Sequence, residues 1–221
     1  MGRERIEPGG QSATVGRLEA AGGPDAPARP LRADAQRNVD ALLAAAKAVF
    51  ATSGVNAPVR EIAANAGVGV GTVYRHFPRR SDLVTAVFRR EVDACADEAP
   101  VLAAEYEPSE ALERWLYRYA DFIATKRGLA AALHSGDPAF DALPAYFEKR
   151  FRPALGSLIE SAAAAGAIRG DLDAMDLLQA VANLCLHTAG ERPDHTRRMI
   201  ALLIDGLRYR ASAPQHARGN W

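Results

Sequence analysis

The chain has little cysteine and no long apolar segment. Its 221 residues include only Cys95 and Cys185, which are too few and too far apart for a disulfide framework or a cysteine-based metal site. We expect both to be reduced residues of a helical core. A membrane-spanning helix needs about 20 mainly apolar residues, and neither such a run nor a signal-peptide pattern occurs. These absences predict a cytoplasmic protein with no membrane partner.

Motifs of the common enzyme classes are also missing. Neither HExxH nor GxSxG occurs, and neither cysteine adjoins a candidate base. Four histidines are scattered along the second half of the chain, at positions His134, His187, His195 and His216. The run Gly67-x-Gly69-x-Gly71 does not indicate a nucleotide-binding loop, because a helical pattern rather than a strand precedes it. We therefore expect no enzymatic activity, no cofactor and no bound metal.

No segment alternates apolar and polar residues as a half-buried strand does, so we expect an all-α fold. Apolar spacing and Gly or Pro punctuation predict helices over residues 35–52, 59–66, 71–77, 82–99, 108–126, 128–134, 140–165, 173–188 and 193–209. Residues 1–30 are rich in Gly, Ala and Pro, which predicts a disordered arm, and residues 211–221 read as a frayed tail. The arm is either inert or a minor-groove contact through its arginines.

The most informative segment is Pro58–Leu83. Apolar residues at helical spacing follow its proline, and Gly67 is expected to end that first short helix in the left-handed conformation that glycine adopts without steric cost. A second short helix follows over residues 71–77 and stops before Pro78. Two short helices joined by a glycine turn are typical of a helix-turn-helix, whose second helix enters the major groove of DNA.

This segment resembles the DNA-binding domain of the TetR family of bacterial one-component transcriptional regulators. The similarity runs over about Arg37–Phe88. It is most specific in the sequence GTVYRHF at 71–77, in Arg80 and in the pair Asp82-Leu83. The resemblance implies that this part of the chain binds DNA.

The resemblance also implies a division of the chain. An N-terminal three-helix DNA-binding domain would occupy residues 31–80, and a C-terminal helical domain for ligand binding and dimerisation would occupy residues 81–210. The last two long helices would pack against their copies in a homodimer. Their apolar residues exceed what one core face needs, and one short recognition helix covers only a few base pairs, so both observations favour a dimer.

The residues predicted to contact DNA are Arg60, Val70, Thr72, Tyr74, Arg75, His76 and Arg80. The resemblance assigns phosphate contacts to Tyr74, His76 and Arg80, which would fix the register of the protein without reading the sequence. Arg60, at the start of the first motif helix, is a further contact candidate.

Base reading would fall to three of these residues. Val70 would contact a thymine methyl group, Thr72 would use its hydroxyl, and Arg75 would read guanine. The alternative for Arg75, as for Arg60, is an ordinary solvated charge. The family often has serine where this chain has Gly69, and a polar residue at the next position, so this loop carries few side-chain donors.

The charge is balanced overall but not along the chain. The formal net charge is zero, yet residues 31–90 hold nine Arg or Lys against four Asp or Glu, and residues 91–221 hold 14 against 19. The positive charge therefore lies on the helix-turn-helix part, where DNA phosphates would need it.

Aromatic side chains recur at helical spacing in the predicted regulatory domain. The residues predicted to contact a ligand are Trp115, Tyr119, Phe122, His134, Tyr146, Phe147 and Phe151. By resemblance, their helices enclose a ligand pocket, and the apolar character of the set favours an apolar or aromatic small-molecule effector. The alternative is an ordinary aromatic core.

These observations predict a ligand-responsive transcriptional regulator, specifically a repressor. It would bind a near-palindromic operator in double-stranded DNA as a homodimer and would be released or tuned by a small molecule. The alternative is a helical protein-interaction module that has lost specific DNA binding, which the poor donor content of the loop at Gly69 and Val70 favours. A strong dependence of DNA binding on salt would separate the two.

Overall fold

The computed structural model describes Met1 and residues 28–133, 136–187 and 193–209, and within these ranges the fold is all-α, which confirms the predicted class. The helices are α1 (Ala28–Ser53), α2 (Val59–Ala66), α3 (Val70–His76), α4 (Arg80–Glu105), α5 (Pro108–Leu133), the 3₁₀ turn η1 (Pro138–Phe140), α6 (Leu143–Ala164), α7 (Ala174–His187) and α8 (Pro193–Tyr209). The predicted arm at 1–30 and the tail at 211–221 fall largely or wholly outside these ranges.

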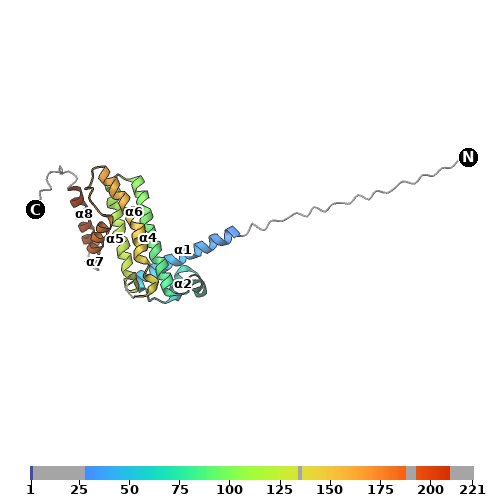
Figure 1. Ribbon diagram of the computed structural model, residues 1–221. Coiled ribbons are helices and arrows are strands. Elements are labelled where there is room, and N and C mark those ends of the chain that lie inside the picture. Colours follow the sequence, from blue (N-terminus) through green and yellow to red (C-terminus); the bar gives the residue numbers. More distant parts are fainter. Residues whose placement is uncertain (2–27, 134–135, 188–192, 210–221) are drawn as a thin grey trace.

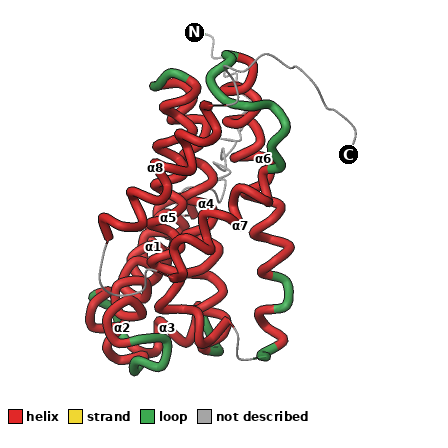
Figure 2. The backbone as a smooth tube through the Cα atoms, turned by 90° about the vertical axis from the view of Figure 1, so that its left-hand side faces the viewer, coloured by secondary structure: helices red, strands yellow, loops and turns green. Residues whose placement is uncertain are grey.

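The helices form a small lobe and a long helical body. Figure 1 shows α4, α5 and α6 running side by side, with α7 and α8 at the outer edge of this body. Figure 2 shows α2 and α3 together at one end of the molecule. Helix α1 packs against α2 on one side and against α4 and α5 on the other. The helix-turn-helix is therefore attached to the body through α1 and α4.

Two of the helix ends predicted within the body are wrong. Helix α4 does not stop before Pro100 but continues to Glu105. The proline ring is exposed, while Ala96 and Ala99 beside it are buried, so packing along the inner face outweighs the one lost helical hydrogen bond. Helix α5 likewise passes through Gly128 to Leu133 as one element, because a glycine inside a helix costs only about 1 kcal/mol relative to alanine.

Other bounds lie close to the predictions. Helix α2 covers the predicted residues 59–66, and α8 covers 193–209. Helix α7 begins after Asp173, whose carboxylate accepts the N–H groups of Met175 at 2.7 Å and Asp176 at 3.1 Å, as a helix cap does. Helix α1 is the exception: it begins at Ala28, well before the predicted start at residue 35, and includes the last residues of the predicted arm.

Both cysteines are buried and neither forms a disulfide, as predicted. Burial raises the pKa of the Cys95 thiol to about 12, so this group stays protonated at neutral pH. The carbonyl of Cys95 accepts the indole N–H of Trp115 at 2.9 Å, which ties α4 to α5. Cys95 therefore belongs to the packed interior of the body.

Candidate nucleic-acid interface and aromatic cluster

The turn between α2 and α3 depends on Gly67. Its backbone lies in the left-handed region at φ 68°, and the N–H of Val68 donates to the carbonyl of Ala63 at 3.0 Å, which closes the end of α2. Gly69 differs, because its φ of −72° suits any residue and no heavy atom stands within 4 Å of a Cβ added there. The backbone therefore requires glycine at the first of these positions and not at the second.

One buried residue orients α3. Val73 is 1% exposed and belongs to the same core as Ile62 and Ala63 of α2. Helical geometry turns the next residue, Tyr74, away from the core, where it is 51% exposed, and Val70, the first residue of the helix, is 40% exposed. Two large side chains on a seven-residue helix are thus held at the surface.

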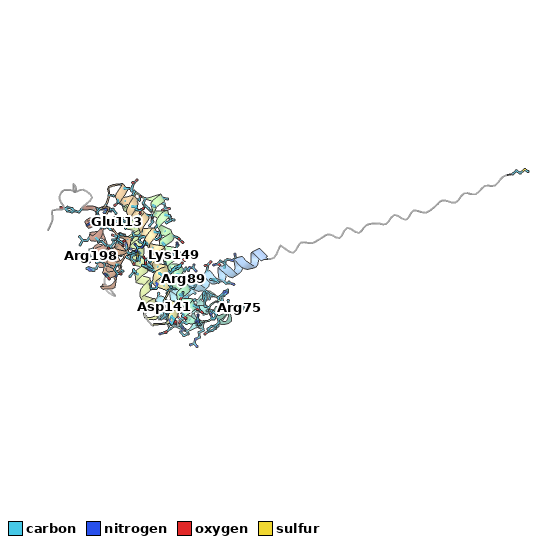
Figure 3. All side chains as sticks on the ribbon, viewed as in Figure 1. Arg75, Arg89, Glu113, Asp141, Lys149 and Arg198 are labelled. Carbon is cyan, nitrogen blue, oxygen red and sulfur yellow. The ribbon has the colours of Figure 1, made fainter. Side chains whose placement is uncertain are left out.

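The polar candidates of the motif lie on the same lobe. Arg75 and Arg60 are exposed, and Thr72 and His76 are half-buried. In the part of the chain that the structure describes, no hydrogen bond or ion pair engages either arginine. Figure 3 shows Arg75 in the lobe, on the opposite side of the molecule from Arg198 of α8. Both guanidinium groups are available to a phosphate or a base.

Arg80 occupies a different position from its neighbour Arg79. The Nη1 group of Arg80 donates to the backbone carbonyl of Val55, in the loop between α1 and α2. Arg80 therefore ties the start of α4 to the base of the helix-turn-helix, a contact that sequence reasoning did not foresee. Arg79 keeps an exposed side chain and pairs with Asp82 at 3.2 Å.

Asp82 caps the start of α4. Its Oδ2 accepts the backbone N–H of Arg79 at 2.9 Å. This hydrogen bond holds the pKa of the carboxyl group below its ordinary value, and the Arg79 side chain lowers it further. The charged form of Asp82 is therefore favoured by folding.

Replacing this cap should produce a pH-dependent loss of stability. We expect Asp82→Asn to lower the free energy of unfolding at pH 7 by about 1 kcal/mol or less, since the carboxylate is only half-buried and solvent screens its charge. Because the folded-state pKa is lowered, the contribution is present above the unfolded pKa of about 3.9 and disappears as the pH falls through the folded value, so wild type and variant should converge only at a pH below that folded value. Urea unfolding followed by circular dichroism at both pH values measures this. Glu160→Gln, on the exposed surface of α6, is the control, and an equal Asp82→Asn deficit at both pH values would contradict the assignment.

Two charged contacts join α1 to α4. Lys47 donates to Glu91 at 2.6 Å, and Glu91 is only 7% exposed. Arg90 donates to the backbone carbonyl of Asp40 at 2.7 Å. An ion pair with one buried partner resists separation, because removing either charge leaves the other without compensation. These contacts fix the lobe against α4.

A second polar network joins α4 to α6. The hydroxyl of Tyr146 donates to Asp93 at 2.7 Å, and Arg150 donates to the same carboxylate at 2.7 Å. The guanidinium of Arg89 lies 4.9 Å from the centre of the Tyr146 ring. Burial raises the pKa of the Tyr146 hydroxyl, and the hydrogen bond to Asp93 raises it further, so the group remains a donor. Tyr146, predicted as a ligand contact, is engaged here with α4.

The other predicted ligand contacts pack as one aromatic cluster, which consists of Trp115, Tyr119 and Phe122 of α5 and Phe147 and Phe151 of α6. Phe151 is fully buried at its centre, with ring centroids 4.6 Å from Phe147 and 5.5 Å from Tyr119. The rings of Trp115 and Tyr119 stack at 5.8 Å. These distances are typical of attractive aromatic pairs. His134, the seventh predicted contact, lies outside the described residues.

Tyr119 brings a hydroxyl into this aromatic cluster. The residue is 2% exposed and lies near Cys95 and Cys185, and burial raises the pKa of the phenol. No hydrogen bond to this hydroxyl is made by the residues that the structure describes.

Within the described ranges, no helix is long and apolar enough to cross a membrane. In the same ranges, no group of three or more His, Cys, Asp or Glu residues is placed to hold a metal ion.

The fold and the motif define a helix-turn-helix transcriptional regulator, and comparison with known proteins identifies its family. Residues 42–87 match the model of bacterial regulatory proteins of the tetR family, and residues 107–209 match the C-terminal domain of SbtR-like transcriptional regulators. The chain therefore belongs to the TetR family, and it is a regulator rather than an enzyme.

Solved structures agree with this assignment. A TetR transcriptional regulator from Streptomyces coelicolor is 40% identical, with a TM-score of 0.66, and the match covers 76% of this chain and 97% of that one. A TetR regulator from Mycobacterium vanbaalenii is 37% identical, with a TM-score of 0.66, covering 81% and 99% of the two chains. A TetR-like regulator from Mycobacterium smegmatis, solved in complex with proflavine, is 22% identical over 77% and 95% of the two chains and shares the fold, with a TM-score of 0.58.

The curated relatives are more distant. An HTH-type transcriptional regulator from Staphylococcus aureus strain USA300 is 28% identical over 109 residues, which is 48% of this chain. The chain spans 59% of the length of that relative.

Proposed function

We propose that this protein is a ligand-responsive repressor that binds a near-palindromic DNA operator as a homodimer. The observation that carries the proposal is the orientation of α3. The turn at Gly67 and the buried Val73 hold Val70, Tyr74 and Arg75 outward on one lobe. A short helix fixed in this way suits insertion into the major groove.

The contacts with phosphate would come from Tyr74 and His76, with Arg60 as a further contact. Arg80 would act there only with the guanidinium N–H groups that its bond to the Val55 carbonyl leaves free. Contacts of this kind set the register of the lobe on DNA.

The base contacts would come from Val70, Thr72 and Arg75. The exposure of Val70 suits contact with a thymine methyl group, and the unengaged guanidinium of Arg75 suits the paired acceptors of guanine. Repression would follow from steric exclusion at the operator, which requires no contact with polymerase.

The homodimer would form through α7 and α8. These helices lie at the outer edge of the body, and Leu202 of α8 is 65% exposed. A dimer would present two copies of α3 to two half-sites, which is the reason for a near-palindromic operator. We place the protein in the cytoplasm, where its operator would lie.

The effector would be an apolar or aromatic small molecule that binds at the aromatic cluster. The unpartnered hydroxyl of Tyr119 would supply one hydrogen bond within otherwise apolar surroundings. Helix α4 is linked to α6, which carries part of the aromatic cluster, through the Tyr146–Asp93 hydrogen bond. It is linked to α1 through the Lys47–Glu91 contact. A ligand that favours one position of α4 would change the separation of the two α3 helices, and it would act only by its difference in affinity for the two states.

The test of DNA binding is fluorescence anisotropy of the purified protein on duplex DNA from upstream of its own gene, repeated over a salt series. We expect site-dependent binding whose affinity falls steeply as salt rises, since phosphate contacts release counterions. A scrambled duplex of equal length and composition is the control. Weak binding that is indifferent to both sequence and salt would overturn the proposal in favour of a protein-interaction module.

A further inference from the structure

The outward face of α8 carries five exposed residues in one narrow strip, which we call the α8 strip: Asp194, Arg198, Leu202, Asp205 and Tyr209. At 3.6 residues per turn, these positions fall within an arc of about 80°. The opposite side of the helix is buried through Ile200, Ile204 and Leu207. The strip therefore faces away from the body and leaves a large leucine in solvent.

The chemical groups along the strip are complementary to the same groups read in the opposite direction. Arg198 and Asp205 lie seven residues apart, about 10.5 Å along the helix axis, and Leu202 lies next to their midpoint. Asp194 and Tyr209 share that same midpoint, between residues 201 and 202. An antiparallel copy of the helix, turned about this point, would set base against acid and carboxylate against phenol.

The charges needed for such a pairing are available. Among the described residues, no ion pair or hydrogen bond engages Arg198. Asp205 pairs with Arg208 of its own helix, at 3.4 Å, and its side chain remains 68% exposed. Arg208 is itself bound to Glu113 of α5 at 2.7 Å, which fixes α8 on the body while leaving the strip outward.

We propose that α8 pairs antiparallel with a second copy of itself, in a register that sets Arg198 against Asp205 of the partner subunit and brings the two Leu202 side chains together at the two-fold axis. The inference rests on the proposed homodimer and specifies its partner surface. A two-fold interface requires the same patch on both subunits, and only a sequence that is complementary to its own reversal satisfies this. A parallel pairing in the same register would set arginine against arginine.

Charge reversal tests this register. Arg198→Asp places an acid opposite the partner's Asp205, and Asp205→Arg places a base opposite the partner's Arg198, in both cases twice per dimer. We expect each single variant to weaken the dimer on the order of 30-fold, because two attractive pairs become two repulsive ones. Sedimentation velocity over a protein concentration series measures the dissociation constant, and the deficit should shrink at high salt.

Two combinations make the test specific to the register. An equimolar mixture of the two single variants should form heterodimers with wild-type affinity, because each acid then faces a base. The double variant Arg198→Asp/Asp205→Arg should also dimerise as the wild type does. Lys149→Asp is the matched control: it is an exposed lysine on α6, and Figure 3 places it over the body and apart from Arg198.

The outcomes separate the register from the dimer. If the wild type dimerises and both single variants dimerise equally well, the register is wrong while the proposed homodimer stands. If the single variants weaken the dimer but neither the mixture nor the double variant recovers wild-type affinity, Arg198 does not face Asp205 of the partner subunit, and the proposed register is wrong in this case too. If the wild-type protein is monomeric both in solution and when bound to operator DNA, the proposed homodimer is wrong, and the register is wrong with it. Far-ultraviolet circular dichroism of each variant shows that reduced affinity does not come from unfolding.

Discussion

Arg75→Ala is expected to weaken operator binding by about 10- to 100-fold and to reduce discrimination at one base pair of each half-site. The side chain is exposed on α3, and the described part of the chain gives it no ion pair or hydrogen bond. A guanidinium that reads guanine contributes about 1–3 kcal/mol of discrimination, and its loss affects one position in the sequence. Anisotropy titrations on a set of operators with single base-pair changes would measure both effects.

A matched comparison shows what kind of contact Arg75 makes. Tyr74→Phe removes only a hydroxyl from the adjacent exposed residue, and without its hydrogen bond to phosphate the protein should bind every operator variant more weakly by a similar factor. Lys149→Ala, on α6, should leave affinity unchanged. If Arg75→Ala lowers affinity equally on all sequences, the residue contacts phosphate, and if it changes nothing, the residue is a solvated charge.

The helix-turn-helix could be predicted from the sequence because its determinants are local. Gly67 indicates the left-handed backbone that ends α2. The spacing of Ile62, Ala63 and Val73 indicates which faces of α2 and α3 are buried. Such signals lie within a few residues of the structure that they specify, so one sequence is sufficient to read them. The family assignment followed from this segment.

Helix ends inside the body could not be predicted in the same way. Pro100 and Gly128 are helix-ending signals by local rules, yet α4 and α5 pass through them. In α4 the buried Ala96 and Ala99 belong to a face that packs against neighbouring helices, and this packing is not visible in the local sequence.

Polar contacts between helices could not be predicted from the local sequence either. Lys47 and Glu91 are 44 residues apart, and Tyr146 and Asp93 are 53 apart, so nothing in the sequence indicates that they meet. The same is true of Arg80, whose bond to the Val55 carbonyl spans 25 residues. Two residues predicted as contacts therefore have protein partners that the sequence did not indicate: Tyr146 donates to Asp93 of α4, and Arg80 donates to the loop before α2.

The aromatic residues pose a question that spacing alone leaves open, because a core and a pocket produce the same pattern. The structure supplies ring contacts that favour packing at Phe151 and, at Tyr119, a hydroxyl to which the described residues make no hydrogen bond. The two interpretations predict different costs for removing a ring and for removing the hydroxyl.

Phe151→Ala is expected to lower the free energy of unfolding by about 3–5 kcal/mol, because it deletes a fully buried ring that four other rings contact. Tyr119→Phe should change it by no more than about 0.5 kcal/mol, since the deleted hydroxyl makes no hydrogen bond in the described structure. Urea unfolding at one fixed protein concentration measures both. A loss below about 1 kcal/mol for Phe151→Ala would mean that the ring lines open space rather than packed core. An effector that dissociates the wild type from its operator but not Tyr119→Phe would then place the ligand at that hydroxyl, because this variant keeps the ring and the fold and removes only the polar group.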